Sequence, residues 1–147
     1  MVEKCTKTLK GKIDNVQIIC ADIETLKIEN ASLIVLNLTL QFISPENRQA
    51  LIDKIYQGLN KGGALIVSEK IHFEDQQKQQ QMTELHLDFK RANGYSELEI
   101  AAKRQSIENV LITDSQSTHF KRFDQAGFTS HACHFQCLNF ASFLAVK

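Results

Sequence analysis

Three polar residues stand where a short apolar run ends, a position that suits ligand-binding side chains. They are Asn37, Glu69 and Asp22. Asp22 could accept hydrogen bonds from a ribose hydroxyl or an adenine amino group, and the Asn37 amide can both donate and accept them. Each also has a structural interpretation: Asp22 could cap a helix or close a turn, and Asn37 or Glu69 could bond to a neighbouring loop.

Arg104 interrupts an apolar stripe that Ile100, Ile107 and Leu111 form at helical spacing. A guanidinium group binds a carboxylate through two parallel hydrogen bonds, so Arg104 is a candidate for holding an acidic ligand. Alternatively its stem covers the edge of the core while its charge stays in water.

Cysteine and histidine gather near the end of the chain, at His131, Cys133, His134 and Cys137, which suggests a metal site. On a strand that rises ~3.3 Å per residue, the two cysteines would lie roughly 13 Å apart, too far for one zinc ion. We therefore expect no metal and cysteines that pack as small buried apolar side chains. The spacing of the remaining residues indicates neither a Ser–His–Asp nor a Cys–His arrangement, and no glycine-rich phosphate loop.

The stretch from residue 33 to residue 69 must position Asn37 and Glu69. Residues 33–36 and 64–67 are unbroken apolar runs, typical of strands buried on both faces of a parallel sheet. Between them, Ser44 and Pro45 predict the start of a helix, and Gly62 with Gly63 predicts its end. In such a strand–helix–strand unit, ligands bind at the carboxyl ends of the strands.

The rest of the chain predicts further helices and strands. Residues 2–12 indicate a short polar helix ended by Gly11, residues 16–20 a strand, and residues 73–93 a solvated helix. Ser96 and Glu99 form a capping box that starts a helix running to about residue 110.

The last forty residues predict one more helix and a strand pair. Thr113 with Gln116 suggests the helix start, and Gly127 ends it so that Phe128 can pack on Phe123. Strands at 130–138 and 142–146 are expected to pair antiparallel. The order of elements predicts an α/β fold with a terminal antiparallel hairpin.

Composition excludes several functions. The 147 residues are enough for one domain, residues 1–147. Seventeen acidic residues balance 17 basic ones, which argues against direct nucleic-acid binding. No apolar run approaches the ~20 residues of a membrane span. Four irregularly spaced cysteines favour reduced thiols and a cytoplasmic location.

Several segments together resemble the carboxy-S-adenosyl-L-methionine synthases. The resemblance covers essentially the whole chain, and residues 89–99 carry its most specific part, which ordinary methyltransferases do not share. The matching segments are 35–42, 51–60, 68–70, 88–99, 103–104, 108–110, 113–115 and 135–137.

This resemblance implies a Rossmann-like class I methyltransferase fold with sheet order 3-2-1-4-5-7-6. It also implies a reaction of S-adenosyl-L-methionine with prephenate that yields carboxy-S-adenosyl-L-methionine and phenylpyruvate. A downstream tRNA carboxymethyltransferase would use that product to modify the wobble uridine. By position, Asp22 and Ile23 resemble adenine contacts and Asn37 a second ligand contact. Arg104 resembles the arginine that holds the new carboxylate across a homodimer, and no residue resembles a general base.

The chain departs from the resemblance at its start, where Met1 matches an internal methionine of the family. We therefore expect strands 1 and 2 to be absent. Residues 16–20, the family's strand 3, would then be separated from strand 4 by roughly 14 Å, about three strand spacings. We expect weak ligand binding and little activity from the isolated chain. The alternatives are a non-catalytic dimerising fragment and a generic S-adenosylmethionine-dependent methyltransferase.

Overall fold

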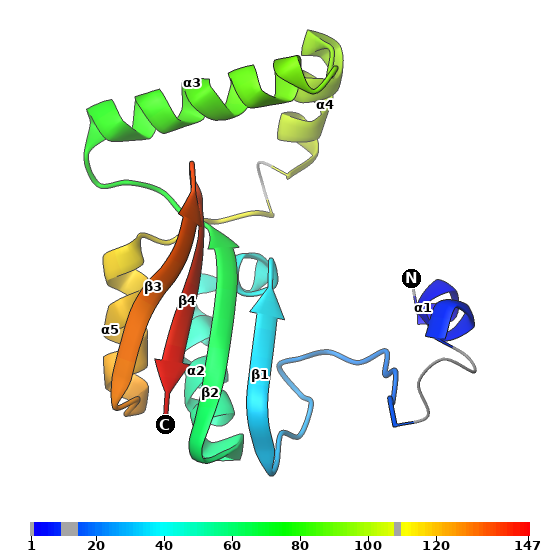
Figure 1. Ribbon diagram of the computed structural model, residues 1–147, viewed down its shortest axis with the longest axis vertical. Helices are drawn as coiled ribbons and strands as arrows, with labels where there is room; N and C mark the ends of the chain where they lie inside the picture. Colours follow the sequence, from blue (N-terminus) through cyan, green and yellow to red (C-terminus); the bar gives the residue numbers. More distant parts are fainter. Residues whose placement is uncertain (1, 10–14, 108–109) are drawn as a thin grey trace.

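A computed structural model describes residues 2–9, 15–107 and 110–147. It has an α/β fold with one four-stranded mixed sheet in the order β1-β2-β4-β3 (Figure 1). The strands are β1 (Ala31–Asn37), β2 (Leu59–Lys70), β3 (Ser130–Cys137) and β4 (Phe140–Val146). The helices are α1 (Val2–Leu9), the 3₁₀ helix η1 (Leu40–Phe42), α2 (Pro45–Gly58), α3 (Gln76–Ala92), α4 (Glu97–Ile107) and α5 (Gln116–Ala126).

The predicted strand–helix–strand unit is confirmed. β1 and β2 are parallel, with Leu36 paired to Val67 and Asn37 to Ser68, and α2 connects them. Ser44 precedes α2 and Pro45 is its first residue, as predicted, although the Ser44 side chain makes no capping hydrogen bond.

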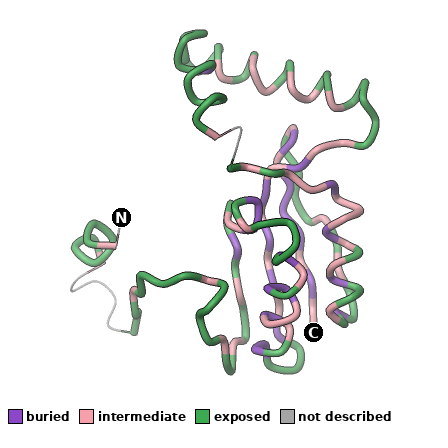
Figure 2. The backbone as a smooth tube through the Cα atoms, turned by 180° about the vertical axis from the view of Figure 1, so that it is seen from behind, coloured by how far each residue is buried: buried purple, intermediate pink, exposed green. Residues whose placement is uncertain are grey.

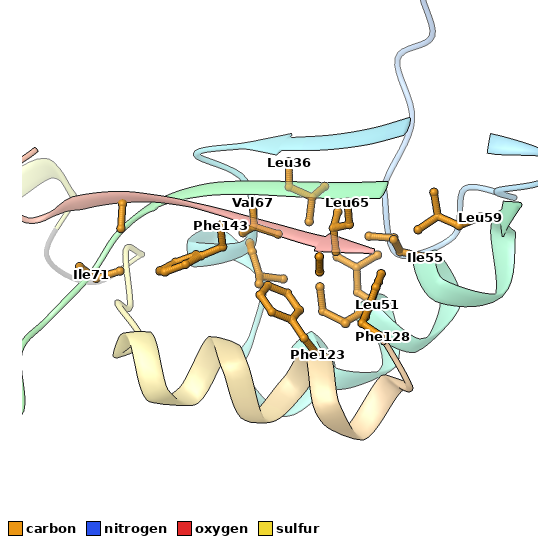
Figure 3. Close-up of a cluster of buried hydrophobic side chains, with 14 residues drawn as sticks. Leu36, Leu51, Ile55, Leu59, Leu65, Val67, Ile71, Phe123, Phe128 and Phe143 are labelled. Carbon is orange, nitrogen blue, oxygen red and sulfur yellow. The ribbon is translucent and has the colours of Figure 1, made fainter. Parts of the chain in front are cut away.

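The hydrophobic core lies between the sheet and the two helices α2 and α5 (Figure 3). Ile55 of α2, Phe123 of α5 and Phe143 of β4 have no exposed surface, and neither do Leu65 and Val67 of β2. The apolar face predicted for α2 packs in this core, which therefore fixes the strand ends that carry Asn37 and Glu69.

The predicted terminal hairpin is also confirmed, since β3 and β4 pair antiparallel. Gly127 ends α5 with a left-handed φ of 99°, and Phe128 packs edge-on against Phe123 with ring centroids 5.8 Å apart. The start of α5 differs from the prediction. Ser115, not Thr113, caps the helix, because the Ser115 hydroxyl accepts a hydrogen bond from the Thr118 N–H.

Residues 16–20 form no strand, so that prediction was wrong. Val16 and Ile19 are about half exposed, and β1 is the edge of the sheet. Backbone groups of a strand need a neighbour to pair with, and the described residues supply none beside this segment. Figure 1 shows the segment leading away from the sheet toward α1.

The glycine pair does not end α2, which stops four residues earlier at Gly58. Gly62 and Gly63 lie instead in an irregular part of β2, where the Gly62 N–H donates to the Lys147 carbonyl and Gly63 accepts from the Lys147 N–H. The left-handed φ of 75° at Gly62 explains the need for glycine there.

The helices α1, α3 and α4 agree with the helices predicted from the sequence. α1 ends at Leu9, and the predicted stop at Gly11 lies outside the described residues. α3 has no buried residue, which confirms the predicted solvated helix (Figure 2). The Ser96–Glu99 capping box begins α4, which is described to Ile107; residues 108 and 109, just before the predicted end, lie outside the described residues. No helix in the described part of the chain is long and apolar enough to cross a membrane.

Candidate functional site

The carboxyl ends of β1 and β2 lie side by side in the sheet, and they carry the candidate residues Asn37 and Glu69. Beyond Asn37 the chain turns sharply at Leu38, whose φ is 52°, and the Leu38 N–H donates to the Ser68 carbonyl at 2.8 Å. This bond extends the parallel ladder by one residue and starts the loop that contains η1. The Asn37 side chain is exposed beside this loop, where a ligand could reach it.

Glu69 holds the loop in place from the end of β2. Its carboxylate accepts hydrogen bonds from the backbone N–H groups of Thr39 at 3.0 Å, Leu40 at 2.8 Å and Gln41 at 3.3 Å. Glu69 is 1% exposed, and this burial raises its pKa above the ordinary value, against the lowering effect of the three hydrogen bonds and of Arg48. The structural interpretation of Glu69 is therefore confirmed: it positions the loop after Asn37.

Gln41 joins the two strand ends a second time. Its side-chain oxygen accepts a hydrogen bond from the Lys70 N–H at 3.0 Å, and its carbonyl accepts one from Arg48 Nη2 at 3.2 Å. Gln41 is 5% exposed. The loop beside Asn37 is thus fixed by buried polar contacts, which prepares a rigid surface for a ligand.

Asp22 forms a turn. Its Oδ1 accepts a hydrogen bond from the Glu24 N–H at 2.8 Å, and its carbonyl accepts bonds from Thr25 and Leu26. The turn is attached to α2 because Lys54 Nζ donates to the Ile23 carbonyl at 2.7 Å and to those of Glu24 and Leu26.

Ile23 lies on this turn and is partly buried against the hydrophobic core. The turn interpretation of Asp22 therefore holds in this structure. Its carboxylate still has capacity for a further donor, because a carboxylate accepts several hydrogen bonds.

Arg104 lies on α4, beyond the carboxyl end of the sheet (Figure 1). It lines two small cavities of about 230 and 210 Å³, and Lys70 lines both of them too. The fold therefore brings Arg104 near the end of β2, while Asn37 is the last residue of β1 and Asp22 lies on the segment that precedes β1. The sequence analysis did not single out Lys70, although its position next to Glu69 at a strand end was a signal for it.

The histidine side chains of β3 make polar contacts of their own. The described residues contain no group of three or more potential metal ligands. His131 Nε2 lies 2.8 Å from Asp124, and His134 Nε2 lies 2.8 Å from Ser142 Oγ. The expectation of buried cysteines was wrong for Cys137, which is exposed, and Cys133 is half-buried, because β3 is an edge strand.

The comparisons with known proteins agree with this arrangement. A model of the methyltransferase domain family matches residues 1–67. "Carboxy-S-adenosyl-L-methionine synthase" of Ruthia magnifica subsp. Calyptogena magnifica is 74% identical over 147 residues, which are all of this chain and 62% of that protein. The protein of the same name from Shewanella oneidensis is 56% identical, with 100% of this chain and 61% of that protein covered.

Solved methyltransferase structures share the fold. PigF with SAH superimposes with a TM-score of 0.64 at 20% identity, over 98% of this chain and 39% of that one. Human N-acetylserotonin methyltransferase in complex with SAM gives a TM-score of 0.59 at 17% identity, over 86% of this chain and 32% of that one.

These findings define a class I S-adenosylmethionine-dependent methyltransferase fold, and the order β1-β2-β4-β3 corresponds to the 4-5-7-6 part of the expected sheet. Within this class, the chain is homologous along its whole length to carboxy-S-adenosyl-L-methionine synthases. It spans 62% and 61% of the length of these two curated relatives.

Proposed function

We propose that the chain is part of a carboxy-S-adenosyl-L-methionine synthase. In this reaction prephenate loses carbon dioxide and the hydroxyl group of its ring, which leaves phenylpyruvate. The methyl carbon on the sulfur of S-adenosyl-L-methionine gives up a proton, which forms water with the departing hydroxide, and bonds to the carbon dioxide. The observation that carries the proposal is the 74% identity over all 147 residues to a protein of that name. The product would serve a tRNA carboxymethyltransferase that modifies the wobble uridine, and this chain itself would bind no nucleic acid.

The proposed ligand contacts agree with the geometry of the strand ends. Asn37 offers an exposed amide beside a loop that Glu69 holds rigid. Asp22 and Ile23 would contact the adenine from a turn that Lys54 fixes against α2. Arg104 would bind the new carboxylate, because guanidinium and carboxylate match in shape and charge.

We further propose that two copies of the chain associate through α3 and α4. These helices and the turn between them expose large apolar side chains: Phe89 of α3 is 60% exposed, Tyr95 of the turn 56% and Leu98 of α4 79%. Apolar side chains that gather on one surface favour a protein partner. In such a homodimer Arg104 would act across the interface, as the resemblance implies.

Native mass spectrometry of the purified chain tests the proposal. The chain would be mixed with S-adenosyl-L-methionine, carboxy-S-adenosyl-L-methionine and prephenate, and retained and newly formed small molecules would be identified. In a protein of the curated relatives' full length, retention of the carboxy ligand with selective loss in Arg104→Ala is the expected result, whereas the 147-residue chain should retain little ligand. Arg91→Ala is the matched control, since Arg91 pairs with Asp88 and Glu97 on the surface of α3 and α4.

Other outcomes favour other functions. Equal loss of both adenosyl ligands in Arg104→Ala would contradict the role of Arg104. Formation of S-adenosylhomocysteine with an added acceptor would favour a generic methyltransferase. A dimer that retains no ligand at all would favour the non-catalytic fragment.

A further inference from the structure

A cavity of about 670 Å³ lies between the carboxyl end of the sheet and the helices α3 and α4. Its wall is largely aromatic and aliphatic, with Phe42 from η1, Phe89 from α3, Tyr95 from the α3–α4 turn and Phe140 from β4. Figure 1 shows that α3 and α4 lie beyond the ends of the strands, and residues of both helices line the cavity. A cavity of this size and lining accommodates a ligand with a ring-sized apolar body.

The charges around this cavity are almost all positive. Lys70, Lys90 and Lys103 line it, and His86 is a further basic group. Glu99 is the one carboxylate among the described residues that line the cavity. Its Oε2 is already bonded to the Ser96 N–H at 2.9 Å and the Ser96 hydroxyl at 2.8 Å. The cavity therefore attracts anions.

Lys70 is the lysine of this set that comes from the sheet. It ends β2, it is half-buried, and it also lines the two smaller adjoining cavities that Arg104 lines. Its backbone is fixed by the Gln41 side chain and by pairing with Phe140 of β4. Burial, and then the nearby charges of Lys90 and Arg104, lower the pKa of Lys70.

The described part of the chain gives the Lys70 ammonium no ion pair. A half-buried cation that other cations surround is unfavourable unless an anion compensates it. A bound carboxylate would supply that compensation, and the aromatic wall would hold the body of the same ligand.

We propose that this cavity binds a small cyclic carboxylate and that Lys70 is the residue that anchors its carboxylate group, with Lys90 and Lys103 adding positive charge. The inference rests on the proposed function for the identity of the natural ligand, which would be the carboxyl donor. Arg104 would then serve the carboxylated product, while Lys70 serves the donor.

Titration calorimetry on the 147-residue chain tests the role of Lys70. The probes are prephenate, phenylpyruvate, benzoate and, as an uncharged match, the methyl ester of phenylpyruvate. Lys70→Met should weaken the binding of each carboxylate about tenfold or more, because it removes a charge-assisted hydrogen bond. Lys61→Met is the matched control, since Lys61 lies exposed near the opposite end of β2. It should leave every affinity unchanged.

The outcomes separate this inference from the proposed function. Carboxylate binding that depends on Lys70, together with no turnover of prephenate by a protein of the curated relatives' full length, would support the cavity site and reject the proposed reaction. Equal binding to wild type and Lys70→Met, binding of the ester as tight as that of the acid, or no binding of any carboxylate would overturn the inference. Lys103→Met, at an exposed position, should weaken binding in the same direction and serves where Lys70→Met unfolds.

Discussion

Arg48 of α2 and Asp114, just before α5, form an ion pair with an Nη1–Oδ2 distance of 2.6 Å. The Arg48 side chain is 1% exposed, and Arg122 Nη1 lies 2.6 Å from the same carboxylate oxygen. The guanidinium also donates to the carbonyls of Gln41 at 3.2 Å and Ile112 at 2.8 Å. This buried network connects α2 and α5 to the loop beside Asn37, so the candidate site depends on it.

Arg48→Met should destabilise the chain strongly. The change removes a donor to the Ile112 carbonyl, one of the two donors to the Gln41 carbonyl and one of the two cations that pair with Asp114. The free energy of unfolding should therefore fall by about 3–5 kcal/mol, as when one partner of a buried ion pair is removed. Urea unfolding followed by circular dichroism measures it. Arg91→Met, an exposed arginine with surface partners, is the control and should change stability little. An equal loss in the free energy of unfolding for the two variants would show that the buried network does not stabilise the fold.

His119 should make the stability of the chain depend on pH. The imidazole is 2% exposed, stacks on Phe143 at 4.9 Å, and has no hydrogen-bond partner for either ring nitrogen. Burial lowers its pKa from 6.5 to about 4. The unfolded chain therefore binds a proton that the folded chain excludes, and stability falls as pH decreases from about 6.5 to about 4.

The shift in the pKa of His119 lowers the free energy of unfolding by on the order of 3 kcal/mol over that pH range. His119→Phe keeps an aromatic ring and removes the titrating group, so it should flatten this part of the profile. Thermal unfolding at a series of pH values measures both proteins. Parallel profiles for wild type and variant would show that His119 does not carry the dependence.

Glu69→Gln should disturb the candidate site more than the fold. The amide keeps one acceptor oxygen for the Thr39 and Leu40 N–H groups, but its NH₂ group faces the Gln41 N–H, where Glu69 accepts at 3.3 Å. We expect a stability loss of about 1–3 kcal/mol and weaker binding of S-adenosyl-L-methionine beside Asn37. Denaturant unfolding and calorimetry measure the two effects. Unchanged ligand binding would show that the loop needs no anchor.

Patterns in the sequence correctly predicted those structural features that depend on residues close together in the chain. The apolar runs of β1 and β2, the Ser96–Glu99 capping box and the Gly127 helix end were all read correctly, because each depends on residues close in sequence. Long-range contacts were not predicted. The bond from Arg48 to Asp114 spans 66 residues, and those from Glu69 to the η1 loop span about 30. The periodicity of the sequence gives no information about contacts between residues so far apart.

The failed strand at 16–20 has a related cause. Its apolar residues have the composition of a strand, but pairing depends on a neighbouring strand, and β1 offers its edge without contacting them in this structure. The early end of α2 is also a tertiary effect. A Cβ atom on Gly58 would lie 2.5 Å from the Ile28 carbonyl oxygen, so the chain needs glycine there to let residue 28 approach the helix.

Gly58→Ala should accordingly push residue 28 away from α2. Backbone atoms of Ile28 cannot move as a flexible side chain does, so we expect a loss of about 1–3 kcal/mol in the free energy of unfolding. Gly94→Ala is a useful comparison, because nothing lies within 4 Å of that position and its strain comes from a φ of 86° alone. Urea unfolding of both variants would show whether close contact or backbone conformation costs more. A stable Gly58→Ala chain would contradict the close approach.

Leu98→Asp should separate the proposed dimer. Leu98 lies on α4 and is 79% exposed, so replacing it costs the folded chain little, whereas a charge in an apolar interface is unfavourable. We expect a monomer by sedimentation velocity that keeps its folded circular dichroism spectrum. Ile19→Asp, at a 55% exposed position far from α4 in sequence, is the control and should stay dimeric. If wild type and Leu98→Asp sediment alike, the proposed interface at α4 is wrong.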